Sequence, residues 1–239
     1  MLKRLRRARQ QDRRRVVSRR GAAMSLPFAD RRAAGRALAQ RLAALKLPGP
    51  VVVLALPRGG VPVAVEVARA LGAALDLVLV RKIGAPWQPE FAVGAVAEGE
   101  PPQIVVDPTV QAMAGVDLDY VNEQARAGLR EIARRRQVYL RGRPLVPVEG
   151  CTAVVVDDGI ATGATMRAAL KAVRVRRPAR LVLAVPVAPS DTLAELSAEV
   201  DLVVCLKQPR PFEAVGRHYI DFEQVGDDEV VAALDSPRP

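Results

Sequence analysis

The chain has 239 residues, half of them hydrophobic, and it carries a formal net charge of +10. This length suits one α/β domain, and the composition allows a sizeable core. No apolar run approaches the roughly 20 residues that cross a bilayer, which argues against a membrane protein. The two cysteines form no CxxC motif, so we expect structural thiols in a reducing cytoplasm.

The positive charge is concentrated at the N-terminus. Residues 1–24 hold ten Lys or Arg and one Asp, a local charge of +9 that leaves +1 for the rest of the chain. One interpretation is a basic disordered tail, or a start of translation that really lies at Met24. The other is an arm that binds nucleic acid through its phosphates. In either case we expect residues 25–239 to form a single domain.

Short apolar runs alternate with helical periodicities through the rest of the sequence. The runs are uninterrupted, as is typical of strands buried on both faces. Asp30 and Asp117 stand where they would cap the first helix and a long middle helix, and Gly72 closes another. Strands that alternate with helices favour a parallel sheet with right-handed crossovers. We therefore predict an α/β fold with about five parallel strands flanked by helices, the strands lying over residues 51–56, 75–80, 152–156, 181–185 and 202–205.

Regularity breaks over residues 83–106, where Gly and Pro recur. Two short β-like stretches, 91–96 and 103–106, stand within this segment, so we expect a hairpin or a flexible arm inserted in the domain. Such an arm is suited to close over a site and exclude water. Beyond Pro209, aromatic residues recur, and we expect this segment to pack over one end of the sheet as a small C-terminal hood.

The loop after the strand at 152–156 combines acids with glycines and threonines. Asp157 and Asp158 emerge together at the end of a buried strand, where open α/β sheets bind ligands. Gly159 and Gly163 permit a tight turn that directs backbone N–H groups inward, and the dipole of the next helix converges on the same point. Because carboxylates accept hydrogen bonds from vicinal hydroxyls, a phosphate site beside two acids indicates a sugar phosphate. The alternative is a Gly-rich turn whose Asp residues cap the next helix, whereas Walker A and Rossmann motifs are absent.

This loop resembles the signature of type I phosphoribosyltransferases, which bind 5-phosphoribosyl-1-pyrophosphate (PRPP). The resemblance covers residues 154–165 and implies a type I phosphoribosyltransferase fold. By it, Asp157 and Asp158 would hold the ribose 2- and 3-hydroxyls, and the rest of the loop would hold the 5-phosphate. The loop residues that would bind PRPP beside the two acids are Gly159, Ala161, Thr162, Gly163, Ala164 and Thr165.

Two further segments resemble the family's pyrophosphate-binding elements. Arg58-Gly59-Gly60 follows Pro57 after the strand at 51–56. It is similar to the loop in which a strained peptide, often cis, turns backbone N–H groups towards pyrophosphate. Arg81-Lys82 resembles the basic pair that several members place after their second strand, although a solvated strand end is the alternative. The resemblance implies catalytic roles for Asp157, Asp158, Arg58 and Lys82. Arg58 and Lys82, with Arg81, would neutralise the leaving group.

Between Phe28 and about Val231, the order and spacing of motifs are similar to a bacterial group of predicted phosphoribosyltransferases. In this chain the shared motifs read RKIGAP from Arg81, EF from Glu90, FEAVG from Phe212 and YIDF from Tyr219. The resemblance implies an enzyme of the glycosyltransferase class. It would transfer ribose 5-phosphate from PRPP to an unidentified small-molecule acceptor, such as a nucleobase, with release of pyrophosphate.

The resemblance also implies Mg²⁺ as cofactor, bound through PRPP, with Asp157 and Asp158 as candidate protein ligands. A homodimer is a candidate assembly. The alternative function is a non-catalytic regulator that senses PRPP or a nucleotide on this fold and binds nucleic acid through the basic arm.

Overall fold

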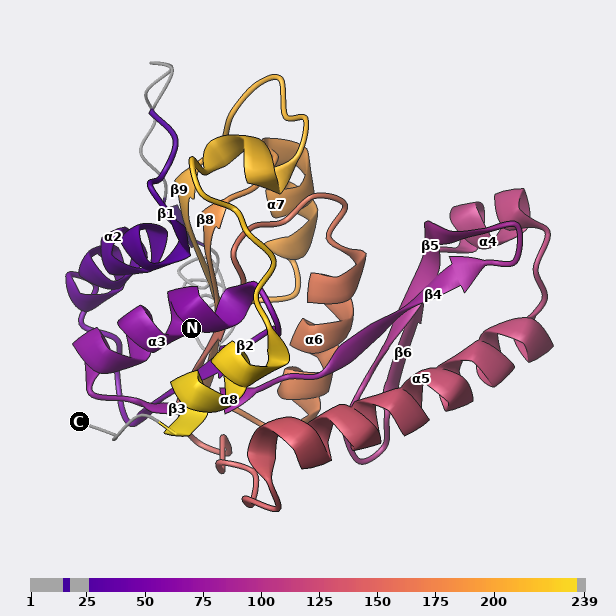
Figure 1. Cartoon of the computed structure of the whole chain (residues 1–239), viewed down its shortest axis with the longest axis horizontal. Coiled ribbons are helices and arrows are strands. Elements are labelled where there is room, and N and C mark those ends of the chain that lie inside the picture. Colours follow the sequence, from indigo (N-terminus) through magenta and orange to yellow (C-terminus); the bar gives the residue numbers. More distant parts are fainter. Residues whose placement is uncertain (1–14, 18–25, 236–239) are drawn as a thin grey trace, which may run out of the picture.

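In a computed structural model, which describes residues 15–17 and 26–235, helices surround two separate sheets (Figure 1). The larger sheet is parallel, with the strand order β1-β9-β8-β7-β2-β3. The predicted five-stranded parallel sheet is confirmed, and β1 adds a short sixth strand at its edge. The strands are β1 (Arg15–Val17), β2 (Val51–Ala55), β3 (Ala74–Leu77), β7 (Thr152–Val156), β8 (Arg180–Val187) and β9 (Leu202–Lys207).

Strand β1 comes from the segment for which we predicted a disordered tail. Its residues pair in parallel with β9, from Arg15 opposite Leu202 to Val17 opposite Val204. Without β1, β9 would present unpaired backbone groups at the edge of the sheet, and such groups pair with any extended segment. These three residues therefore form a strand, whereas we expected a disordered tail. The other residues of the segment 1–24 lie outside the described residues.

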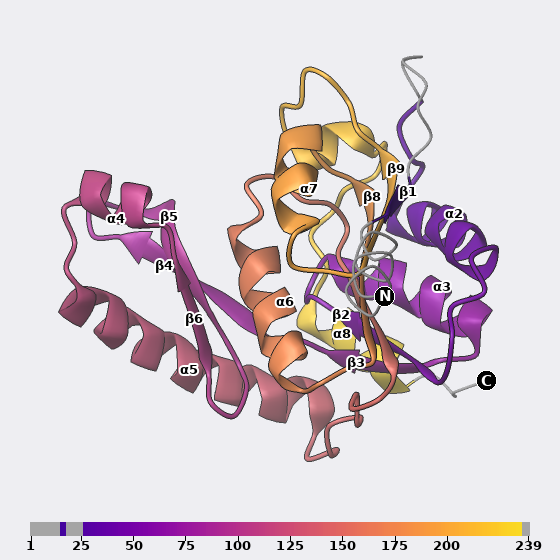
Figure 2. The same ribbon diagram turned by 180° about the vertical axis from the view of Figure 1, so that it is seen from behind.

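Alternate side chains along each strand build a core on both faces of the parallel sheet. In β2, Val53 belongs to one core and Val52 to the other. This double burial explains the uninterrupted apolar runs in the sequence. Helices α2 (Arg31–Ala43) and α3 (Gly60–Leu71) cover the first face, and α6 (Ala164–Val175) and α7 (Ser190–Leu196) cover the second (Figures 1 and 2).

The predicted helix boundaries are confirmed by their capping residues. Asp30 accepts a hydrogen bond from Ala33 N (2.6 Å) at the start of α2. Asp117 accepts one from Tyr120 N (2.8 Å) at the start of α5 (Leu118–Leu140). Helix α3 ends at Gly72, whose φ of 58° lies in the left-handed region that glycine adopts without steric cost.

The segment predicted as an arm folds into an antiparallel sheet. Its order is β4-β5-β6, which confirms the hairpin. Pro89 and Gly84 lie within these strands, although the recurrence of Pro and Gly in this segment suggested a break in regular structure. Pro89 lies near the start of β5 and Gly84 lies at a register shift, two places where strands tolerate such residues. The elements are β4 (Val80–Ala85), β5 (Gln88–Ala97), β6 (Gln103–Val106) and the following helix α4 (Pro108–Ala114).

This second sheet projects to one side of the parallel sheet and lies between α5 and α6 (Figures 1 and 2). Ala95 and Ala97 of β5 pack against Ala168 and Ala172 of α6, so that small side chains allow a close approach. On the other side, α5 crosses β4 and β5 at Gly128, where a Cβ would lie 2.8 Å from Val96 Cγ1. The base of the arm is therefore packed on both faces.

The predicted strand over 75–80 is divided between the two sheets. β3 ends at Leu77 and β4 begins at Val80. The change of sheet occurs at Leu79, whose N–H donates to Glu98 Oε1 (3.0 Å) and whose carbonyl accepts from Glu98 N (3.1 Å). Arg81 and Lys82 consequently lie within β4 and not at the end of a strand of the parallel sheet, which corrects the sequence-based placement.

The predicted C-terminal hood packs over the carboxyl end of β8. Tyr219 forms a bridge with Phe28, and both cluster with Phe222 and with Val187, the last residue of β8. The hood comprises the 3₁₀ turn η1 (Val215–His218) and the loop that leads to α8 (Asp227–Asp235), which packs against α3 and α5. Within residues 15–17 and 26–235, no helix has the length and hydropathy needed to cross a membrane.

Candidate sugar-phosphate site

Two of the predicted ligand loops meet where β2 and β7 end. These strands pair in register along their whole length, so they end at the same level. A Cβ on Gly59 would lie 2.1 Å from Asp158 Oδ2, and one on Gly60 would lie 2.9 Å from Asp157 Cα. Because no side chain fits into such gaps, only glycine permits this approach. The Pro57–Arg58 peptide is cis, as the resemblance implied.

The two acids of the second loop lie half-buried beside each other. The Asp158 N–H donates to Asp157 Oδ1 (2.9 Å). Burial raises the pKa of Asp157 well above its ordinary value, and the charge of Asp158 raises it further. Burial also raises the pKa of Asp158, although the guanidinium of Arg31 opposes that effect. A ligand that donates hydrogen bonds to these oxygens would favour the charged carboxylates.

Arg31 forms an ion pair with Asp158 that the sequence motifs did not predict. Its Nε lies 2.8 Å from Asp158 Oδ2, and only 11% and 14% of the two side chains is exposed. The Asp158 backbone carbonyl accepts a further hydrogen bond from the Tyr219 hydroxyl of the hood. Asp158 is therefore joined to α2 by its side chain and to the hood by its main chain.

The predicted phosphate loop ends at the first turn of α6. Gly163 has φ 81° and forms the N-cap of the helix, where it offers no side chain to the first N–H groups. Ala161 and Thr162 are exposed in front of it. Thr192 of α7 supports the loop from behind, since its hydroxyl donates to Ala161 O (3.0 Å). A helix start with N–H groups left uncapped by a side chain is suited to bind an anion.

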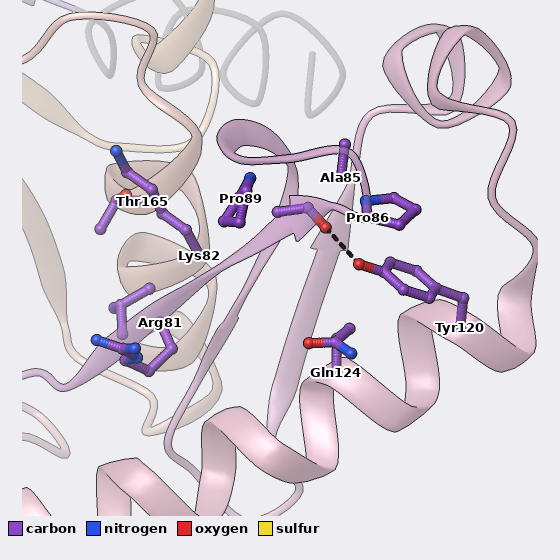
Figure 3. Close-up of a pocket in the computed structure, with 10 residues that line it drawn as sticks. Arg81, Lys82, Ala85, Pro86, Pro89, Tyr120, Gln124 and Thr165 are labelled. Atoms are coloured by element: carbon purple, nitrogen blue, oxygen red, sulfur yellow. Dashed lines mark hydrogen bonds between the residues drawn. The ribbon is translucent and has the colours of Figure 1, made fainter.

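A pocket of about 490 Å³ lies between the arm and this helix start (Figure 3). Arg81, Lys82 and Thr165 line it together, and Figure 3 shows Lys82 extending from β4 towards Thr165. Tyr120 of α5 donates its hydroxyl hydrogen to Gly84 O (2.9 Å) and so holds the arm hairpin at the opposite wall. The predicted basic pair and the end of the phosphate loop therefore share one pocket.

Arg58 is not among the residues that line this pocket. Its guanidinium lies 3.6 Å from the carboxylate of Asp227, at the start of α8. Asp227 also accepts a hydrogen bond from the Tyr139 hydroxyl (2.7 Å), and burial together with this bond raises the pKa of Tyr139 to about 12. The structure thus places Arg58 beside the acid pair's loop but does not bring it to Arg81 and Lys82.

The residues present do not form a metal centre of their own. Across residues 15–17 and 26–235, no group of three or more His, Cys, Asp or Glu side chains is arranged to hold a metal ion. Asp157 and Asp158 supply two carboxylates, and one of them is already paired with Arg31. A divalent ion at this site would therefore need further ligands from the substrate.

Comparison with known proteins decides the family. The model of the phosphoribosyl transferase domain matches residues 30–216. The chain belongs to the phosphoribosyl transferase family. The match covers α2, the parallel sheet apart from β1, the arm and the beginning of the hood, and it ends before α8.

Relatives of this chain are found in Mycobacterium tuberculosis and Thermus thermophilus. Two M. tuberculosis proteins, provisionally named phosphoribosyl transferases, are 50% identical over 208 residues, which are 87% of this chain and 46% of theirs. The chain therefore spans about half the length of these curated relatives. The crystal structure of TT1426 from T. thermophilus is 48% identical, with a TM-score of 0.73 over 87% of this chain and 98% of that one.

Besides Thr192, three residues that the sequence motifs did not indicate contact the predicted loops. Arg31 and Tyr219 contact Asp158, and Asp227 contacts Arg58. They lie 127, 61 and 169 positions from their partners, so no local spacing indicated them. The sequence signal that was available for one of them is the YIDF motif. It begins at Tyr219 and lies in the aromatic segment that we expected to form the hood.

Proposed function

We propose that this phosphoribosyl transferase binds PRPP and transfers its ribose 5-phosphate to a small-molecule acceptor, with release of pyrophosphate. The observation that carries the proposal is the close approach of Gly59 to the Asp158 carboxylate. It places the loop that would bind pyrophosphate directly against the acid pair that would bind the ribose hydroxyls. The start of α6 lies at the end of the same acid loop. These three elements correspond to the pyrophosphate, the sugar hydroxyls and the 5-phosphate of one ligand.

In this proposal each group of residues binds one part of PRPP. The N–H groups between Ala161 and Thr165 bind the 5-phosphate at the positive end of α6. Asp157 and Asp158 accept hydrogen bonds from the ribose hydroxyls, which offsets the cost of burying two carboxylates. Lys82 and Arg81 neutralise the pyrophosphate from the arm side, and Arg58 does so from the loop side after leaving Asp227.

The reaction would break the bond between the ribose C1 atom and the pyrophosphate oxygen, which leaves with the bonding electrons. A lone pair of the acceptor then forms the new bond to C1, and a proton lost from the acceptor passes to solvent. The carbon carries positive charge between the two events, and the nearby carboxylates Asp157 and Asp158 favour that charge. The arm hairpin, held over the pocket by Tyr120, would keep water from replacing the acceptor.

Mg²⁺ enters this proposal as part of the substrate complex. Asp157 and Asp158 would supply carboxylate ligands, and the remaining ligands would be oxygens of PRPP. When bound, the ion would neutralise charge on the pyrophosphate. A nucleobase is a candidate acceptor, and we further propose a cytoplasmic enzyme that can form a homodimer.

Replacement of both acids by Asn tests the proposal. The D157N/D158N variant keeps the size of both side chains and removes their charge. Each hydrogen bond to a charged acceptor contributes about 1.5–3 kcal/mol, so the affinity for PRPP with Mg²⁺ should fall at least tenfold in calorimetric titration. The affinity for inorganic phosphate should hold or rise, because repulsion from the acids is removed.

A charge-matched control is available in two exposed acids away from the site. The E149Q/D235N variant also removes two negative charges, from residues paired with Arg177 and Arg143, and it should bind PRPP like the wild type. Equal PRPP affinity in wild-type and D157N/D158N proteins would contradict the sugar-phosphate interpretation. Pyrophosphate release during incubation with a panel of nucleobases would then identify the acceptor class.

A further inference from the structure

Arg31 belongs to none of the loops assigned to PRPP, yet it binds directly to one of the two acids. We propose that Arg31 is a positioning residue for ribose recognition, which holds one oxygen of Asp158 so that the other oxygen, Oδ1, is presented to the sugar hydroxyls. This inference rests on the proposed function, and it assigns to Arg31 the discrimination between ribose and a sugar without hydroxyls.

The ion pair uses one of the two oxygens of the Asp158 carboxylate, Oδ2. Arg31 Nε lies 2.8 Å from Asp158 Oδ2. Oδ2 is also the oxygen that faces the loop, since a Cβ on Gly59 would lie 2.1 Å from Oδ2 and 3.2 Å from Oδ1. Arg31 therefore occupies the oxygen that the loop already covers. In this proposal, Oδ1 is the oxygen left for the sugar hydroxyls.

Arg31 is itself held in place by the hood. Its Nη1 donates to Glu223 O (2.7 Å), and its guanidinium lies over the Phe222 ring, 3.9 Å from the ring centroid. The planar guanidinium makes both contacts and the ion pair at once, which the single ammonium group of Lys cannot do. With 11% of the side chain exposed, few other rotamers are open to it. This arrangement fixes the carboxylate direction before ligand binding, which is the condition for a preorganised site.

Electrostatics supports the same role. Burial and mutual repulsion raise the pKa of Asp157, and burial raises that of Asp158, while Arg31 lowers the pKa of both. A charged carboxylate accepts a stronger hydrogen bond from a hydroxyl than a neutral carboxyl group does. Arg31 thus favours the form of the acids that recognises hydroxyls, in addition to orienting one of them.

The test compares two ligands that differ only in their hydroxyls. Ribose 5-phosphate and 2,3-dideoxyribose 5-phosphate are titrated calorimetrically into wild type and into Arg31→Met, which retains an unbranched side chain without charge. The wild type should prefer ribose 5-phosphate at least tenfold. In R31M this preference should fall at least fivefold, whereas the affinity for the dideoxy ligand should stay within twofold. R31K should retain an intermediate preference, because it restores charge without the contacts to the hood.

The neighbouring residue provides a matched control. Arg32 is also on the first turn of α2, but its side chain is 59% exposed and 3.8 Å from Glu66. R32M should keep the wild-type preference. In a D158N background, R31M should cause no further loss of preference, because the residue through which it acts is already changed.

Each outcome bears on one of the two proposals. Equal weakening of both ligands in R31M would show a structural role only, and tighter ribose 5-phosphate binding would show that Arg31 competes with the ligand. Either result overturns the inference. Should R31M fail to fold, a wild-type preference in both R31K and Phe222→Leu would overturn it as well. Failure of the wild type to bind ribose 5-phosphate would instead contradict the proposed function itself.

Discussion

At the scale of single residues, Gly59 sets the distance between the two loops. The Asp158 carboxylate occupies the place where a Cβ would stand, and the ion pair with Arg31 prevents it from moving away freely. Gly59 has φ −58°, a conformation open to any residue, so the constraint comes from space and not from the backbone. A methyl group here must push the loop and the acid apart.

We therefore predict that Gly59→Ala reduces PRPP affinity at least tenfold. Overpacking of this kind costs about 1–3 kcal/mol, so the thermal midpoint should also fall. Gly226→Ala is the matched control, because a Cβ there would make only an ordinary contact of 3.7 Å with Glu229. Calorimetric titration and thermal melting measure both effects. A G59A protein that binds PRPP like G226A would show that the loops separate without cost.

The residues of the candidate site differ in whether their sequence neighbours indicate their role. Asp157, Asp158 and Gly163 were predictable because a buried strand, a tight turn and a helix start follow one another within a few positions. The pairing of Arg31 with Asp158 joins residues 127 positions apart. This ion pair depends on how α2 and the hood pack against the sheet, and no spacing of residues in the sequence indicates that packing.

At the scale of elements, strand identity was predictable but sheet membership was not. The apolar run over 75–80 serves two sheets, since buried apolar residues continue without a break from the end of β3 to the start of β4, through Leu77, Val78 and Leu79. The change at Leu79 depends on Glu98, a residue from a distant strand end. Helix α4 was missed for another reason, because it has only seven residues, and Pro108 at its start resembles the Pro-rich segment before it.

The arm hairpin is predicted to act as a lid over the shared pocket. Trp87 stands at its turn with 60% of its surface exposed, so chymotrypsin should cut after Trp87 early in limited proteolysis. PRPP with Mg²⁺ should slow that cut, because a ligand in contact with Lys82 and Thr165 would tie the arm to α6. Inorganic phosphate is the control ligand, since it reaches the phosphate loop without bridging to the arm. A cut that PRPP does not slow would argue against a lid.

At the scale of the whole molecule, most of the net positive charge lies at the N-terminus, before the domain. Residues 1–24 carry a local charge of +9, and the domain that follows is nearly neutral. The described residues of the two cores on the faces of the parallel sheet lie between Leu38 and Val231. The tail's described contribution is β1, three residues that pair with the edge of β9. Among the described residues, the helices, the other strands and the candidate site all lie within residues 26–235.

A protein that begins at Met24 should accordingly fold and bind PRPP like the full chain. Three edge residues contribute at most about 1 kcal/mol of net stability, which corresponds to a thermal midpoint lower by about 2–4 °C for a domain of this size. Val16→Pro in the full chain places a residue that strands tolerate poorly at the middle of β1 while it keeps the charge, so it should reproduce the same small shift. A loss of ten degrees or more on truncation, with V16P unchanged, would show that the basic residues themselves pack on the domain. Salt-sensitive binding of duplex DNA that disappears on truncation would favour the nucleic-acid arm over a passive tail.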